Sequence, residues 1–219
     1  MTEKNLDIRY EDEYLRVVYK PRGVVIDELG WGYAHRLDKN TCGLLCMAKD
    51  EKTLELLQGM LKRHEIKRTY IGIVEGVMQG SGTIDKNLIR SPRNRTLFVT
   101  VTGATRGEYL SAHGQSQSVG RNAVTHFTVI ENFKNATLVQ FNLETGRTHQ
   151  IRVHCKSMSR PIVGDPEYNP NGKIARGVGQ MLESVDIDFT HPVTGKRVHV
   201  TADRSPLFCE ILKKCAKIV

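Results

Sequence analysis

The distribution of apolar and polar positions predicts several β-strands along the chain. Each candidate is a run of apolar and β-branched residues, in places alternating with polar ones, and turn-forming residues bound it. The five clearest candidates are residues 15–20, 44–48, 67–75, 123–130 and 136–143. The last two flank an Asn-Phe-Lys-Asn segment, which is typical of a β-hairpin. Two more strands are expected around the His-Pro-Val-Thr-Gly turn at 191–195.

Helical periodicity occurs at three places. Asp50 can cap a helix that runs to about residue 64 and carries a leucine stripe of Leu54, Leu57 and Leu61. A second helix is predicted over residues 148–158, and it ends before Pro161. Its inward-facing residues would be Ile151, Cys155 and Met158. A third helix is expected from Pro206 onward.

Residues 80–121 carry the least regular pattern. They are rich in Gly, Ser, Thr and Arg, with a strand-like run at 97–101, and they predict loops and short strands. Hairpins outnumber alternating strand–helix units over the whole chain. We therefore expect one α+β domain over residues 1–219, with a mostly antiparallel mixed sheet that helices flank.

Composition adds a preference for a polyanionic partner. The chain has 219 residues, with 32 Lys and Arg against 24 Asp and Glu, a formal net charge of +8. Basic side chains that neutralise phosphates release counterions, which favours binding to nucleic acid. Charge alone is equally compatible with a basic surface that binds nothing in particular.

Targeting signals and cysteine spacing indicate a cytoplasmic protein. No apolar run approaches the roughly 20 residues that a bilayer span needs, and the charged N-terminus does not resemble a signal peptide. Five scattered cysteines form neither a disulfide framework nor paired zinc ligands. Reduced thiols in the cytoplasm are the simplest interpretation.

A polar segment around Asp38 leads directly into the apolar run at 44–48. Its neighbours His35, Arg36 and Lys39 are basic or titratable, and cations favour the ionised form of a nearby carboxylate. An ionised carboxylate can act as a nucleophile or a base. Spacing alone favours another interpretation, in which Asp38 only stabilises the turn through its side chain.

Two further segments combine basic residues with groups that can contact RNA. In the predicted second helix, His149, Arg152 and Lys156 share one face near the helix N-terminus, where a phosphate or an enzyme carboxylate can bind. Tyr70 follows Lys67 and Arg68 at the start of a strand and can stack on a base. A solvated basic stripe and a packed strand tyrosine are the commoner meanings of these two patterns.

The order and the residue types of these segments resemble those of the RluA-type pseudouridine synthases. The matching motifs begin with Tyr-Glu-Asp-Glu at 10–13 and Val-Val-Tyr-Lys-Pro-Arg-Gly at 17–23, and the Asp38 segment at 35–45 follows. Lys-Arg-Thr-Tyr stands at 67–70. The remaining motifs lie at 143–154, 161–168 and 189–196. The resemblance extends from about residue 8 to about residue 205.

The resemblance implies a role for each site residue. Asp38 would be the catalytic aspartate, with Arg152 paired to it. Arg36 would fill the space that the flipped uridine leaves, and Tyr70 would stack on the flipped base and assist removal of the proton from carbon 5. Ile151 would be an apolar wall of the base pocket. His35, Arg147 and His149 are expected to bind the substrate or brace the loops around it.

The chemistry that the resemblance implies requires no cofactor. Isomerisation moves the ribose bond from nitrogen 1 to carbon 5 of uracil, so nothing is oxidised or hydrolysed, and neither a redox cofactor nor a metal ion is expected. The expected partner is structured RNA, ribosomal more than transfer RNA, with no membrane and no DNA, and the expected state is a monomer. The catalytic cleft should run across the sheet.

Three features depart from the family pattern. Cys42 stands where the family usually has serine, and its thiol is a weaker hydrogen-bonding group. Few residues precede Tyr10, so we expect no appended RNA-binding domain, and loop arginines would bind RNA instead: Arg90, Arg93, Arg95 and Arg106. The connection between Gly30 and His35 is short, which would alter the rim of the cleft.

A silent RNA-binding protein and a metal-dependent nuclease are the two alternatives to a synthase. A catalytically silent RNA-binding protein of the same fold would not need Asp38, Tyr70 and Arg152 together. A metal-dependent nuclease would need clustered ligands, and His149 and His154 are five residues apart, which places them poorly on one helix face.

Overall fold

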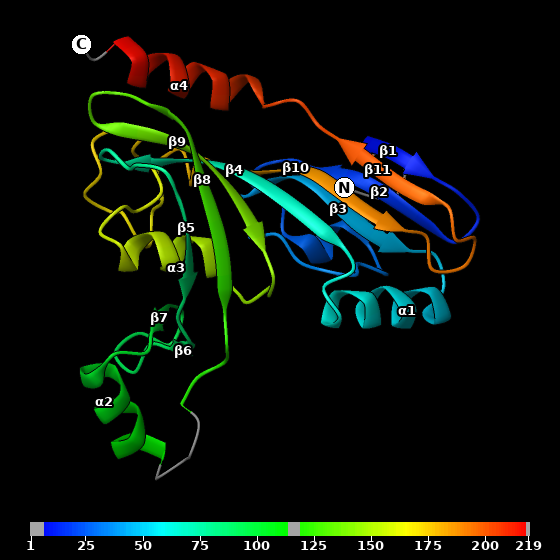
Figure 1. The fold of residues 1–219 in the computed structure, drawn as a ribbon, viewed down its shortest axis with the longest axis horizontal. Helices are drawn as coiled ribbons and strands as arrows, with labels where there is room; N and C mark the ends of the chain where they lie inside the picture. Colours follow the sequence, from blue (N-terminus) through cyan, green and yellow to red (C-terminus); the bar gives the residue numbers. More distant parts are fainter. Residues whose placement is uncertain (1–6, 114–118, 218–219) are drawn as a thin grey trace.

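A nine-stranded sheet organises the protein in this computed structural model, which describes residues 7–113 and 119–217. The strand order is β1-β2-β3-β10-β4-β9-β8-β5, with β11 paired to β10 (Figure 1). The strands are β1 (Asp7–Glu11), β2 (Leu15–Lys20), β3 (Cys42–Ala48), β4 (Lys67–Glu75), β5 (Ser81–Asp85), β8 (Val124–Asn132), β9 (Ala136–Leu143), β10 (Leu182–Thr190) and β11 (Arg197–Thr201). All neighbours pair antiparallel except β3 and β10, which are parallel. The predicted α+β fold with a mostly antiparallel sheet is confirmed.

The described residues also form four α-helices and one short 3-10 helix. They are η2 (Ile26–Leu29), α1 (Glu51–Lys62), α2 (Gly103–His113), α3 (Gln150–Ser157) and α4 (Pro206–Lys217). Asp50 caps α1 as predicted, because its carboxylate accepts hydrogen bonds from the Thr53 backbone N–H at 2.8 Å and from the Thr53 hydroxyl at 2.6 Å. None of the helices among the described residues is both long and apolar enough to cross a membrane.

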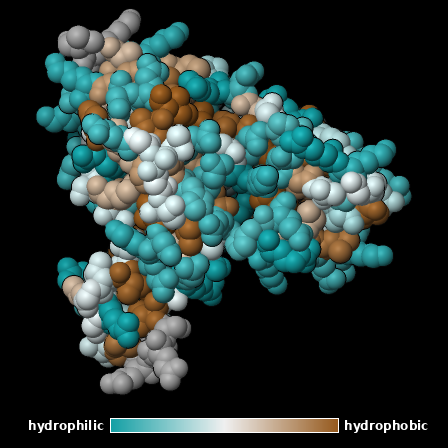
Figure 2. Space-filling view, viewed as in Figure 1, coloured by the Kyte–Doolittle hydropathy of each residue, from teal (hydrophilic) through white to brown (hydrophobic). Residues whose placement is uncertain are grey.

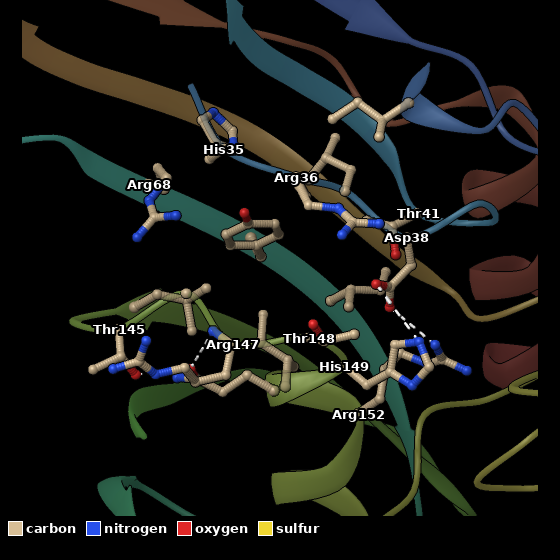
Figure 3. A pocket seen from close by; sticks show the side chains of 18 of the residues that line it. His35, Arg36, Asp38, Thr41, Arg68, Thr145, Arg147, Thr148, His149 and Arg152 are labelled. Carbon is tan, nitrogen blue, oxygen red and sulfur yellow. Dashed lines mark hydrogen bonds and ion pairs between the residues drawn. The ribbon is translucent and has the colours of Figure 1, made fainter. Parts of the chain in front are cut away.

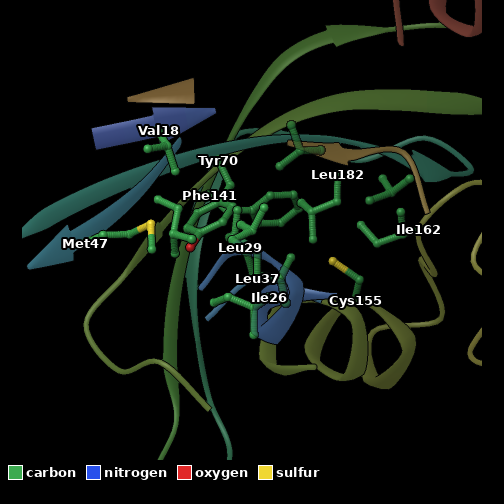
Figure 4. Close-up of a cluster of buried hydrophobic side chains, with 14 residues drawn as sticks. Val18, Ile26, Leu29, Leu37, Met47, Tyr70, Phe141, Cys155, Ile162 and Leu182 are labelled. Atoms are coloured by element: carbon green, nitrogen blue, oxygen red, sulfur yellow. The ribbon is translucent and has the colours of Figure 1, made fainter. Parts of the chain in front are cut away.

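The two faces of the sheet carry separate parts of the core, because side chains alternate along each strand. On β4, Tyr70 and Val74 pack with η2 and α3, whereas Ile71 and Ile73 pack against α4. The cluster on the Tyr70 side also contains Phe141, and Figure 4 shows how these side chains fill the space above α3. This face of the sheet is the one that supports the functional site.

The parallel contact between β3 and β10 requires a glycine. Gly43 has a φ of +114°, and a Cβ built on it would lie 2.0 Å from the backbone oxygen of Ser184. Only glycine allows this close approach. The polar segment that carries Asp38 leads directly into β3, so this contact also fixes the end of that segment.

An arm projects from the sheet between β5 and β8. It consists of β6 (Leu88–Arg90), β7 (Phe98–Thr100) and α2, with Figure 2 showing hydrophobic side chains gathered on it. The short strands were predicted, but α2 was not. Gly103 and Gly107 lower the helix propensity of this segment, and α2 has no buried residue among those whose burial is described.

Candidate active site

A cleft of about 910 Å³ opens beside β4. Residues 34–41, which precede β3, line one side of it, and residues 143–152, at the start of α3, line the other. Side chains from both segments point toward one another across the opening (Figure 3). The predicted cleft across the sheet is therefore present, and most of its lining comes from loops that the sheet and α3 hold in place.

Asp38 and Arg152 meet in this cleft, although they are 114 positions apart in the sequence. The guanidinium Nη1 of Arg152 donates a hydrogen bond to Oδ2 of Asp38 at 2.9 Å. Within the described part of the chain, the other carboxylate oxygen, Oδ1, accepts no direct hydrogen bond, and His149 Nε2 lies 3.9 Å from it. The Asp38 side chain is 23% exposed, so a substrate can reach this oxygen.

Arg152 is itself held from behind by Asp165. The guanidinium donates from Nε and Nη2 to the two oxygens of Asp165, at 2.7 and 2.8 Å, and a further bond joins Nη2 to Glu167. Burial alone lowers the pKa of Arg152, but the hydrogen bonds to Asp165 and the charges of Asp38 and Asp165 outweigh it, and the pKa is raised. Arg152 therefore stays charged and in one orientation.

His149 stands beside this ion cluster in a left-handed backbone conformation with a φ of 57°. The backbone N–H of Phe98 donates to the Tyr168 hydroxyl oxygen at 2.9 Å, and the same hydroxyl lies 2.9 Å from Nδ1 of His149. Burial lowers the pKa of His149, with Asp38 opposing the shift. A neutral ring that accepts the Tyr168 proton at Nδ1 carries its own proton on Nε2, toward Asp38.

Tyr70 and Ile151 supply apolar surface next to the carboxylate. Both side chains are buried, at 4% and 5% exposed, and both line the cleft. Burial raises the pKa of the Tyr70 hydroxyl, so this group remains protonated at neutral pH. The cleft thus combines one accessible carboxylate with walls on which a planar base can rest.

Comparison with known proteins identifies the family of this chain. The sequence profile of the RNA pseudouridylate synthase family matches residues 27–157, a stretch that contains both Asp38 and Arg152. The chain belongs to the RNA pseudouridine synthases. Enzymes of this family are isomerases, and the RluA-type resemblance that the motifs indicated is confirmed.

Individual relatives cover nearly the whole synthase. The uncharacterized RNA pseudouridine synthase YlyB of Bacillus subtilis is 35% identical over 97% of this chain and 74% of its own length. Ribosomal large subunit pseudouridine synthase D of Zymomonas mobilis is 33% identical over 90% of this chain and 69% of its own. The solved structure of human RNA pseudouridylate synthase domain containing 1 has the same fold, with a TM-score of 0.72 at 24% identity over 91% of this chain and 83% of that one.

Three other predicted site residues of the synthase occupy different environments. His35 is buried beneath the loop, where its Nε2 accepts a hydrogen bond from the Cys46 backbone N–H at 3.2 Å, and burial lowers its pKa to about 3. Arg36 is exposed and lines the cleft. Arg147 is also exposed at the cleft, with its Nε donating to the Asn122 carbonyl at 3.0 Å.

The expected basic face of the second helix does not form as one surface. The α-helix begins at Gln150, so His149 precedes it. Arg152 is buried among carboxylates, whereas Lys156 is exposed. Helical spacing alone does not predict that Arg152 is buried and Lys156 exposed, because it does not show which residue faces carboxylates from other segments.

Two cations that the sequence analysis did not single out, one fully buried and one partly buried, hold the Asp38 segment. Lys20 is fully buried, and its Nζ donates to the carbonyls of Pro21, Val24 and Lys39. Arg22 donates from Nη1 to the carbonyls of Asn40 and Gln180, at 2.6 Å each. In the sequence, both belong to the Lys-Pro-Arg-Gly segment at 20–23, which is part of one of the motifs of the family resemblance.

Cys42, the departure from the family pattern, joins the same support. Its thiol donates to Oε1 of the buried Glu183 at 3.2 Å. Burial and the charge of Glu183 raise the pKa of Cys42 to about 11, so it is a protonated donor at neutral pH. The five cysteines are all free. Among the described residues, no three His, Cys, Asp or Glu side chains are arranged to hold a metal ion.

Proposed function

We propose that this synthase isomerises uridine in structured RNA with Asp38 as the reacting carboxylate. The observation that carries the proposal is the asymmetry of this carboxylate. Arg152 binds Oδ2 and fixes the orientation of the group, while Oδ1 faces the cleft with no direct hydrogen bond from the described residues. A side chain that only stabilised a turn would accept a hydrogen bond from a nearby backbone N–H, and within the described residues none donates to the Asp38 carboxylate.

The reaction requires one such group. The bond from ribose carbon 1′ to nitrogen 1 breaks, the uracil turns, and carbon 1′ joins carbon 5, which then loses its proton while nitrogen 1 gains one. Asp38 either attacks a carbon of the nucleotide or assists departure of the base by stabilising or deprotonating the sugar. Both routes need an ionised carboxylate with a free oxygen.

The apolar walls fit a flipped base. Removing a base from its stack costs a few kcal/mol, and contacts with Tyr70 and Ile151 offset part of this cost by stacking and burial. We assign to Arg36, which is exposed at the cleft, the role of occupying the space that the base leaves in the RNA. We assign His35 to the support of the loop, and Arg147 and His149 to the rim that meets the substrate.

Ribosomal RNA is the substrate that we propose, because the named relatives include a ribosomal large subunit pseudouridine synthase. The arm offers basic side chains for the RNA backbone, among them Arg90, Arg95 and Arg106, whereas Arg93 is paired with Glu108 at 2.5 Å. We further propose a monomer that acts on RNA and not on DNA, in the cytoplasm, where reduced thiols persist.

Tritium release from RNA labelled at carbon 5 of uridine tests this function. Wild-type protein should release tritium from large-subunit ribosomal RNA and not from transfer RNA, and the release should persist in the presence of a chelator. Mapping the modified nucleotide then names the position. Tight RNA binding without release from any of several structured RNAs would instead indicate the silent RNA-binding protein.

A further inference from the structure

Arg68 is a buried cation in the cleft for which the described residues supply no counter-ion. It belongs to β4, is 5% exposed, and lines the cleft together with Tyr70. Its Nε is buried without a hydrogen-bond partner. Among residues 7–113 and 119–217, no carboxylate forms an ion pair with the guanidinium and no acceptor binds it.

The other buried cations around the site, Arg152 and Lys20, are ion-paired or hydrogen-bonded. Arg152 contacts three carboxylates, and Lys20 donates to three backbone carbonyls. Burial of a charge is unfavourable unless the charge is paired or hydrogen-bonded. The uncompensated Arg68 is thus an exception within the same cleft, and a missing partner that arrives with the substrate explains it.

The geometry leaves the Arg68 guanidinium open to the cleft. Arg68 and Tyr70 are two residues apart on one strand, so their side chains share a face, and Figure 3 shows the guanidinium pointing into the opening. Gly146 in the opposite loop makes room for it, because a Cβ there would lie 3.0 Å from Nη1. A side chain larger than hydrogen at residue 146 would press on the guanidinium.

We propose that Arg68 is an anion subsite that binds a phosphodiester group of the RNA beside the uridine that enters the cleft. The inference rests on the proposed function, because it assumes that RNA enters beside Asp38. A phosphate matches the observation better than a uracil carbonyl, since only an anion neutralises the buried charge. The planar guanidinium also suits two oxygens of one phosphate.

The salt dependence of binding tests the subsite with nonauridylate as the probe. Each phosphate neutralised on a single strand contributes about 0.7 to the slope of log K against log salt. Arg68→Met should lower the slope by about this amount and weaken binding about tenfold at 0.1 M salt. Arg68→Lys should restore part of the loss. Arg197→Met, which removes an exposed arginine paired with Asp188, is the matched control and should change neither quantity.

Two further measurements distinguish a binding role from a structural one. Without RNA, Arg68→Met should unfold at a higher urea concentration than wild type, because it removes an uncompensated buried charge. A nonauridylate whose linkages are all neutral methylphosphonates should bind wild type and Arg68→Met equally, because it carries no phosphate charge for Arg68 to neutralise.

If the slope of log K against log salt were equal in Arg68→Met and wild type, the phosphate subsite would be refuted. It would also be refuted if Arg197→Met lost as much slope and affinity as Arg68→Met. Neither outcome bears on the catalytic proposal, because neither experiment requires turnover. Conversely, absence of tritium release by the wild type would refute the proposed function, while the slopes would still decide whether Arg68 binds phosphate.

Discussion

Replacing Asp165 with asparagine should show how strongly the buried ion cluster holds Arg152. Asp165 is fully buried, and both of its oxygens accept hydrogen bonds from the guanidinium, at 2.7 and 2.8 Å. A hydrogen bond that involves a charged group contributes about 1.5–3 kcal/mol, whereas a neutral one contributes about 1 kcal/mol. Asparagine keeps one oxygen that accepts from the guanidinium, but it puts an N–H group in place of the other oxygen and removes the negative charge. The free energy of unfolding should therefore fall by about 3 kcal/mol.

Urea denaturation measures this loss directly. With a slope of about 2 kcal/mol per molar urea, the midpoint of Asp165→Asn should fall by about 1.5 M. Asp188→Asn is a matched control, because Asp188 also binds an arginine through both oxygens, at 2.9 Å each, but Arg197 is 69% exposed. This exposed pair should contribute less than about 1 kcal/mol.

Tritium release should fall as well, since Arg152 would no longer be fixed behind Asp38. We expect about a tenfold decrease per folded molecule, the equivalent of about 1.4 kcal/mol. Equal midpoint shifts in Asp165→Asn and Asp188→Asn would refute the reasoning from burial. An unchanged rate in Asp165→Asn would show that Asp165 does not position the catalytic pair.

The remaining predictions concern His35 and Tyr70. The pKa of His35 is about 3 in the folded protein and about 6.5 when unfolded, so the unfolded chain binds more protons between these values. Wild-type stability should therefore fall below pH 6.5 by up to about 1.4 kcal/mol per pH unit, and urea titrations of His35→Gln at pH 5 and 7 should show a smaller difference. If the stability of His35→Gln changed with pH as steeply as that of the wild type, protonation of His35 would be excluded as the cause. Tyr70→Ala should raise the KM for RNA about tenfold through loss of stacking, whereas Tyr70→Phe should leave it unchanged. An equal KM in both variants would exclude stacking.

The sheet was predictable because its strands carry their own pattern. Alternation along β2, β4, β8 and β9 reflects side chains that enter the core on one or both faces, and the strand bounds agree closely with the structure. Helix α2 was missed because its segment has two glycines and no apolar stripe that packs into the core. Local sequence patterns reflect which side chains are buried, and a helix on a projecting arm buries few side chains.

The site was predictable only in part. The motifs placed Asp38 and Arg152 in one family pattern, and the structure brings them within 2.9 Å. Asp165 lies in a family motif that by itself indicates no role for it, because its importance comes from facing Arg152, a contact between two separate segments. In the sequence, Arg68 is only a basic residue close to Tyr70. The lack of a counter-ion among the described residues is visible only in three dimensions.

Asp38→Asn gives the most direct test of the central claim. Asparagine preserves the size of the side chain, and its amide oxygen can still accept the hydrogen bond from Arg152. The account predicts that this variant folds and binds large-subunit ribosomal RNA as the wild type does, but releases no tritium from carbon 5 of uridine. Release at the wild-type rate would show that the carboxylate of Asp38 is not the reacting group.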